Sequence, residues 1–511
     1  MAPFTTIFGG ALVVNLAATI RSSSHWGKVK QTLGLDRNST SSTEEESLVN
    51  KSSDTSDPVL IAKHASLLKR YLAVYLLAAL SDWLQGPYVY ALYDEYGYSQ
   101  HDIAVLFVAG FGSSMVFGTF VGGLADSCGR RKVTILFAVI YIASCMTKHF
   151  KDFKVLMLGR LLGGVSTSLL FSVFDSWLIR SHADAGVSSF LSKSFALAQY
   201  GNSIVAIMAG LAANRAASTS KMTPVFGASD ENPVLYMGGF LNPFDMAIVV
   251  LVIAACLTMV LWEENYGETS AEADGSTKDK KWHDAFSSAF YTTIHNKQIL
   301  YTGLICSLFE GSMFIFVFMW TPAMKALTKE ELPFGLIFAT FMVCCMAGSS
   351  IFSVLIGSIK LEKLCVYVCA VAASAFTLMA FSTSEVGAYL AFLFFEVSVG
   401  VYFPTMGTMK SQIVPENKRA AIYNLYRIPL NFIVLFSLLT DLSPRQSFII
   451  CACMLSGATF LQTRLIEHQK TFFTTSSVPA NESGSDLELG KSTSMEEPLL
   501  DDVDGNDDKE N

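Results

Sequence analysis

The chain has 511 residues, of which 51% are apolar and only 16% are charged. Soluble proteins carry roughly 25% charged residues, so the composition argues against a cytosolic enzyme, a secreted disulfide-rich domain and a nucleic-acid-binding protein. The formal net charge of −8 is concentrated in residues 480–511, which hold eleven acidic residues and two lysines. The acidity therefore belongs to a tail and not to a binding face.

The first part of the chain, residues 1–70, combines an apolar segment with a polar linker. Residues 4–20 form a short apolar stretch that is marginal for a membrane span, and whether it crosses is left open. Residues 36–57 are rich in Ser, Thr and acidic side chains, which leaves too little apolar content for a core. We expect this region to add at most one helix to the fold.

From residue 71, apolar runs of membrane length recur regularly along the chain. Six runs occupy 71–262, a polar connector occupies 263–298, and six further runs occupy 299–466. Each is close to the roughly 20 residues that a spanning helix needs, and 467–511 is expected to be a disordered acidic tail. The pattern predicts an all-α integral membrane protein with the major facilitator fold. It has about twelve transmembrane helices in two six-helix halves, plus the N-terminal apolar helix if it forms.

The distribution of Lys and Arg between the loops predicts the orientation. Fourteen lie on the connector's side, with Lys410 counted among them, and eight lie on the opposite side, with Lys148 counted there. Because cytoplasmic loops carry the excess of basic residues, the connector is expected in the cytosol. We expect a multi-pass protein of the cell membrane, with an endosomal or vacuolar membrane as the alternative.

A glycine-rich basic loop lies between the second and third apolar runs. Residues 122–132 read GGLADSCGRRK and resemble the loop signature of major facilitators, with Ser127 in place of the usual base. Glycines permit a tight turn there, and Asp126 can cap a helix or form ion pairs across the halves. An ordinary cytoplasmic loop would explain the basic residues, but it would not explain the spacing of Gly122, Asp126 and Gly129. We therefore predict a gating loop formed by Gly122, Asp126, Gly129, Arg130 and Arg131.

Ionisable residues inside apolar runs are the candidate substrate and coupling residues. Burying each costs roughly 2.5–3.5 kcal/mol or more, so a paired or functional placement is expected. Arg160 and Glu396 each lie four residues before a glycine, and Asp82 and Glu310 each precede aromatic residues, so the two halves repeat. Helix-locking salt bridges are the alternative, and they are equally expected for Asp175. The candidate set is Asp82, Arg160, Asp175, Glu310, Glu396 and Arg427.

No nucleotide-binding loop, nucleophile elbow, zinc-protease helix or dinucleotide fingerprint occurs in the sequence. The ten cysteines contain no CxxC pair, which argues against a metal site. We therefore expect no enzymatic activity, no cofactor, no metal and no nucleic-acid partner.

Several blocks of the sequence resemble the molybdate-anion transporter family, a eukaryotic branch of the major facilitators. These blocks are SDWLQGPY (81–88), RLLGGVSTSLLFSVFDSW (160–177), WEENYG (262–267), LFEGSMFIFVFMWTP (308–322), GVYFPTMGTMKSQIVPE (400–416) and YNLYRIPLN (423–431). The resemblance runs from about residue 71 to 466 and includes the N-terminal apolar stretch. It implies a secondary transporter that imports molybdate by alternating access, with molybdate and the lipid bilayer as partners.

The candidate residues fit this substrate only if the negative charges of their carboxyl groups are neutralised. Molybdate is a tetrahedral dianion, which Arg160 and Arg427 are suited to hold, yet the carboxyl groups in the apolar runs outnumber these arginines. Either carboxylates pair with the arginines, or protons enter with the anion, carried by Asp82, Glu310 or Glu396. Proton-coupled molybdate import is the leading hypothesis. A carrier of a neutral or cationic solute such as a sugar, and a membrane sensor or scaffold that transports nothing, are the alternatives.

Overall fold

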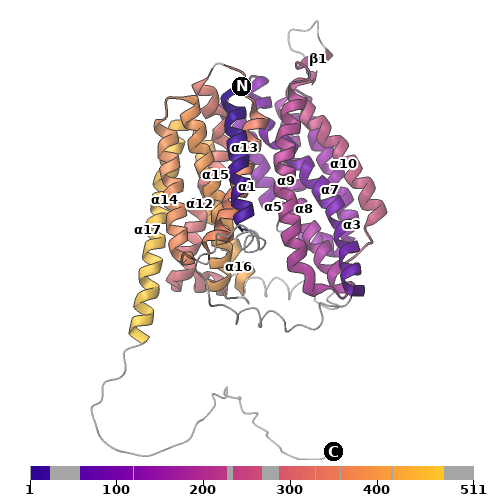
Figure 1. Ribbon diagram of the computed structural model, residues 1–511. Helices are drawn as coiled ribbons and strands as arrows, with labels where there is room; N and C mark the ends of the chain where they lie inside the picture. The colour runs from indigo at the N-terminus through magenta and orange to yellow at the C-terminus, as the bar shows by residue number, and fades with distance from the viewer. Residues whose placement is uncertain are drawn as a thin grey trace, which may run out of the picture. The chain divides into compact units, whose positions relative to one another are not determined.

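The computed structural model (Figure 1) describes residues 2–22, 58–266 and 287–476, except 119, 227–233, 329, 357 and 416–417. The linker 36–57, most of the connector and the tail from residue 477 lie outside the described residues. Residues Met1–His468 form one compact unit, and Gln469–Asn511 form a second. Everything below concerns the first unit.

The N-terminal half of this unit, residues 58–261, contains the six expected helical runs. They are α3 (Pro58–Gln85) continued by α4 (Val89–Glu95), α5 (Gln100–Gly118) continued by α6 (Val121–Cys128), α7 (Arg130–Thr147), α8 (Phe153–Asp184), α9 (Leu191–Ala217) and α10 (Asn242–Leu261). The first run is broken at Gly86–Tyr88, a short 3-10 turn that contains Pro87. Proline lacks the N–H that an α-helix needs, so the run is interrupted a few residues after Asp82.

The C-terminal half, residues 297–468, repeats this arrangement. Its helices are α12 (Lys297–Leu327), α13 (Phe334–Leu355), α14 (Leu361–Phe381), α15 (Glu385–Ile413), α16 (Arg419–Leu439) and α17 (Pro444–Ser476), of which α17 runs past His468 into the second unit. Helices α12, α15 and α16 continue through Pro322, Pro404 and Pro429 respectively. The helix pattern expected from the apolar runs is thus present in both halves.

The N-terminal apolar stretch forms a further helix, α1 (Ala2–Ser22). It packs along α13 of the C-terminal half (Figure 1), where the Thr19 and Ser350 hydroxyl oxygens lie 3.2 Å apart. At its other end, the ring of Phe4 lies 5.0 Å from that of Tyr389 on α15. Eleven helices of the described ranges are long and apolar enough to cross a membrane; they include α1 and omit α3 and α7.

A small β-hairpin marks one end of the helices. Strands β1 (Thr223–Phe226) and β2 (Leu235–Met237) are antiparallel, with Thr223 opposite Met237 and an irregularity after Pro224. We call this the hairpin end, and we call the opposite end, where α10 finishes and α12 begins, the connector end.

The two halves contact each other through polar groups near the hairpin end. Lys325 of α12 forms an ion pair with Asp94 of α4. His101 of α5 lies 2.8 Å from the carboxylate of Asp441, and the Gln100 amide donates to the Leu442 carbonyl at 2.9 Å. These contacts hold α4 and α5 against the C-terminal half at that end of the molecule.

Candidate functional site

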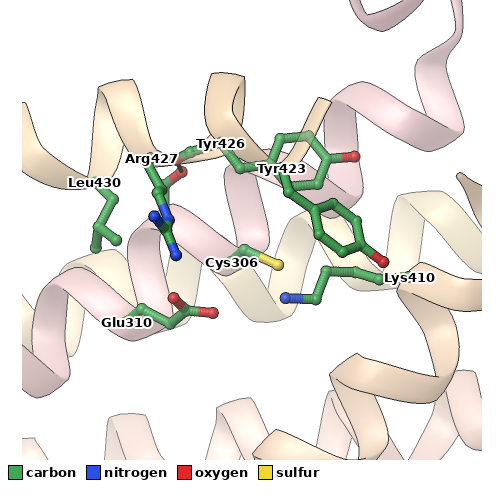
Figure 2. Close-up of a pocket in the computed structure, with 8 residues that line it drawn as sticks. Cys306, Glu310, Lys410, Tyr423, Tyr426, Arg427 and Leu430 are labelled. Atoms are coloured by element: carbon green, nitrogen blue, oxygen red, sulfur yellow. Dashed lines mark hydrogen bonds between the residues drawn. The ribbon is translucent and has the colours of Figure 1, made fainter. Parts of the chain in front are cut away.

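A cavity of about 130 Å³ lies within the C-terminal half, toward the connector end. Three helices supply its walls, which contain both cationic and anionic side chains. Arg427 is eight residues into α16, which places it about 12 Å from the start of that helix. The lining residues, most of them drawn in Figure 2, are Cys306, Ser307, Glu310, Lys410, Tyr423, Tyr426, Arg427 and Leu430.

The cavity has two cations and one carboxylate. Figure 2 shows the Arg427 guanidinium and the Lys410 ammonium entering from α16 and α15, with the Glu310 carboxylate of α12 below Arg427. Glu310 accepts a hydrogen bond of 3.3 Å from the Tyr402 hydroxyl, and the ion pairs of the described chain do not include Glu310. An anion entering the cavity would therefore meet two cations that no ion pair neutralises.

Lys410 corrects the sequence analysis, which counted it as a loop residue. It lies within α15, three residues before the helix ends, and its Nζ lies 5.2 Å from the ring centre of Tyr423. The signal was its spacing: Lys410 follows Tyr402 by eight residues, about two helical turns, so both side chains lie on one face of α15. Because Lys410 lies near the end of α15, the sequence alone did not distinguish it from a loop residue.

The N-terminal half holds Asp82 and Arg160 in a different arrangement. The Asp82 carboxylate on α3 accepts a hydrogen bond from the Tyr141 hydroxyl on α7. Arg160 on α8 donates from Nε to the Leu106 carbonyl at 3.2 Å, and its guanidinium carbon lies 4.6 Å from the ring centre of Phe107. Arg160 therefore packs against α5 and forms no ion pair with Asp82.

Tyrosine hydroxyls, and not arginines, hold the carboxylates inside the helices. Besides Asp82 and Glu310, Asp175 on α8 accepts a hydrogen bond of 3.4 Å from Tyr71 on α3. Glu396 on α15 lies outside the cavity and is 7% exposed, and within the described ranges it has no ion pair. The helix-locking salt bridges considered as an alternative are thus absent for these four residues in the described chain.

The predicted gating loop lies at the connector end of the N-terminal half. Gly122 and Asp126 lie in α6, and Asp126 forms an ion pair of 2.6 Å with Arg130 at the start of α7. Arg131 donates from its guanidinium to the Met259 carbonyl at 2.6 Å. In this structure Asp126 therefore pairs within its own loop and does not reach the other half.

The segment after α10 fastens this loop in place. The Glu264 carboxylate accepts from the backbone N–H groups of Arg131 and Lys132 at 2.8 and 3.3 Å, and so caps α7. Gly129 has a φ of 96°, and a Cβ there would lie 2.7 Å from the Glu264 carboxyl carbon. Only glycine fits this position, which gives the Gly-Asp-Gly spacing of the loop a physical cause.

The helix pattern and its charged interior define a transporter of the major facilitator class, and solved structures share the fold. The bacterial homologue of the human lysosomal transporter Spinster superposes with a TM-score of 0.60 at 12% identity, covering 82% of this chain and 99% of that one. The inward-open xylose transporter XylE from E. coli gives a TM-score of 0.54 at 13% identity, covering 80% and 96%.

The sequence relatives are more specific. A family described as sugar transporters with twelve transmembrane segments matches residues 47–394. The molybdate-anion transporter of Xenopus tropicalis is 32% identical over 400 residues, covering 75% of this chain and 82% of the relative. That of Danio rerio is 31% identical over 396 residues, covering 73% and 78%. The chain belongs to the molybdate-anion transporter family of the major facilitators, and the expected family and fold are confirmed.

Proposed function

We propose that this protein imports molybdate across a membrane by alternating access, coupled to protons. The observation that carries the proposal is the cavity that Arg427 and Lys410 line together, where neither forms an ion pair with a described residue. Relatives at about one-third identity are named for molybdate. A guanidinium presents two parallel N–H donors to an oxyanion, and an ammonium adds a point charge.

Glu310 gives the cavity its proposed coupling group. It lines the same cavity as both cations, so its negative charge would oppose the bound dianion. Protonation of Glu310 would remove this repulsion, and the neutral carboxylic acid would become a hydrogen-bond donor to the anion. Asp82 and Glu396 remain the other coupling candidates from the sequence, but both lie outside the cavity.

Coupling also answers an energetic requirement. A dianion that enters against a negative-inside potential costs about 2.3 kcal/mol per charge for each 100 mV. Two protons moving with it would cancel the charge and remove this cost. Without coupling, the membrane potential would oppose import wherever the inside is negative.

The contacts between the halves support one stage of such a cycle. Ion pairs and hydrogen bonds close the hairpin end, while the cavity lies toward the connector end. With the connector in the cytosol, as the basic residues favour, this arrangement corresponds to an inward-facing state. Breaking the Lys325–Asp94 and His101–Asp441 pairs would accompany opening to the outside.

The test is uptake of radiolabelled molybdate by proteoliposomes that contain the purified full-length protein, with an imposed pH gradient. We expect saturable uptake that rises when the side of entry is acidic. Competition by unlabelled molybdate, tungstate, sulfate and sugars separates the oxyanion carrier from a sugar carrier. Absence of uptake for every solute would favour the sensor or scaffold, and uptake indifferent to the gradient would remove the coupling.

A further inference from the structure

Lys148, which the sequence analysis placed in a loop, is buried at the hairpin end of the N-terminal half. It is the first residue after α7, and it is 2% exposed. Its Nζ has no hydrogen-bond partner among the described residues, and it lies 5.8 Å from the ring centre of Tyr93. A buried ammonium without a partner costs several kcal/mol. Such a group either loses its proton or is stabilised by a counter-charge, and no described residue supplies that counter-charge in this state.

A second cation and an unpartnered hydroxyl lie beside it. The charge of Arg160 acts on Lys148, and burial followed by that charge lowers the pKa of Lys148 to about 7. Tyr93 is fully buried, and its hydroxyl also lacks a hydrogen-bond partner within the described ranges. Two cations and a free donor thus gather where no carboxylate contacts them in the described structure.

Two glycines leave room for the cations. A Cβ on Gly110 of α5 would lie 2.8 Å from an Arg160 guanidinium nitrogen. A Cβ on Gly159 of α8 would overlap the Thr147 hydroxyl first and would also lie 3.1 Å from the Lys148 Nζ. A larger residue at Gly110 would force the Arg160 guanidinium aside, and one at Gly159 would displace the turn that carries Thr147 and Lys148.

His149, the next residue in the chain, does have a carboxylate partner. His149 contacts the Asp245 carboxylate at 2.9 Å. Burial lowers the pKa of His149, but the hydrogen bond and charge of Asp245 outweigh that effect and raise it. Among the described residues, His149 of this loop therefore has a carboxylate partner and Lys148 beside it has none.

We propose that Lys148, Arg160 and Tyr93 form a second oxyanion site, which captures the anion when the hairpin end is open. This inference rests on the proposed function, since the captured anion is the transported one. In the present state the site is closed, no described carboxylate forms an ion pair with it, and the cavity at the connector end takes its place. The anion would thus meet one pair of cations in each half: Arg160 and Lys148 first, then Arg427 and Lys410.

The experiment compares the two sides of the membrane. Initial rates of radiolabelled molybdate transport are measured over a range of concentrations in intact cells and in inside-out vesicles, which offer the anion to opposite ends of the protein. Lys148→Gln should raise KM about ten- to hundred-fold on one side and less than about threefold on the other, since a lost hydrogen bond to a charged group has this size. Arg427→Gln should show the reverse asymmetry.

Two further variants separate binding from folding. Tyr93→Phe removes one oxygen atom and should raise KM on the Lys148 side about fivefold, and Lys148→Arg should restore most of the affinity. Lys151→Gln, at an exposed position three residues along the same loop, is the matched control and should change nothing. A Lys148→Gln protein that reaches the membrane with an unchanged KM on both sides, or with equal changes on both, overturns the site.

A failure of the proposed function would look different. If the wild type moves no molybdate but moves sulfate, and Lys148→Gln weakens sulfate entry from one side, the second site stands and molybdate is removed as substrate. If the wild type moves neither anion from either side, both proposals fall.

Discussion

The two halves hold similar charges in opposite conditions. In the C-terminal half, Arg427 and Lys410 line an open cavity together with Glu310, near the connector end. In the N-terminal half, Lys148 is buried near the hairpin end, where the charge of Arg160 acts on it, and the Asp82 carboxylate accepts a hydrogen bond from Tyr141. One pair of cations is accessible and the other is enclosed. The comparison indicates that a buried cationic side chain can bind an anion only where the surrounding helices leave space for that anion.

Among the substitutions considered, removal of the accessible Arg427 guanidinium should reduce molybdate transport the most. Arg427→Gln should lower molybdate transport about a hundredfold, because a two-pronged donor to a dianion disappears from the cavity. Arg427→Lys should recover only part, since an ammonium cannot present two parallel donors. The measurement is uptake in cells that lack their own molybdate carriers, corrected for surface protein. Arg445→Gln, on an exposed residue at the start of α17, is the control.

Neutralising the carboxylate of the accessible site should act on coupling. Glu310→Gln should make uptake insensitive to an imposed pH gradient, a loss of about tenfold in the stimulated rate for a coupling carboxyl. Asp82→Asn and Glu396→Gln, outside the cavity, should keep the gradient dependence. If Glu310→Gln keeps the dependence and Asp82→Asn loses it, the coupling group lies in the N-terminal half.

Proton binding to Lys148 should make anion entry at the hairpin end depend on pH. In the closed state, burial and then the Arg160 charge lower the Lys148 pKa to about 7. Above that pH the enclosed lysine is mostly neutral and must take up a proton when the site opens and binds the anion. KM for entry at the Lys148 side should rise up to about tenfold between pH 6 and pH 8, as the charged fraction falls. Lys148→Arg stays charged in this range and should abolish the rise. Arg160, Cys145 and Tyr93 are the titratable or charged groups that act on this lysine or contact it in the described structure.

The smallest effect is expected at the gating loop, which belongs to neither pair of cations. Asp126→Asn removes the 2.6 Å ion pair with Arg130 and should lower the maximal rate about threefold to tenfold while KM stays within twofold. The Asp126 side chain is half exposed, so the protein should remain folded. Transport kinetics with a thermal melt check both statements, and a changed KM at an unchanged rate would contradict the gating role.

Hydropathy predicts the fold because a membrane leaves helices few alternatives. The twelve expected runs all correspond to helices, and Pro87 breaks the first of them as its missing N–H requires. The length of the N-terminal apolar stretch did not decide whether it forms a further helix of the fold. Its helix packs on α13, a contact between segments more than three hundred residues apart that no local pattern contains.

The charged groups were predicted less completely. Isolated acids and arginines within apolar runs were found, because their cost marks them in the sequence. Lys410 and Lys148 were missed, since a lysine near a helix end resembles a loop residue until the packing around it is known. The tyrosine partners were missed as well, because hydrogen bonds such as those of Tyr141 and Tyr402 join different helices. Tertiary packing, and not residue type, decides which charge is accessible.

The helix α1 changes how the two halves are connected. Because α1 packs on α13, the chain begins on the C-terminal half, and residues 23–57 then lead to α3 of the N-terminal half. The connector after α10 is therefore the covalent link between the halves, and residues 23–57 add a tether to α1, which is held on the C-terminal half by packing. A link of thirty-five residues can reach at most about 120 Å, so its length sets no limit on rocking of the halves. A protease cut within it would leave α1 held by its contacts with α13 and α15 alone.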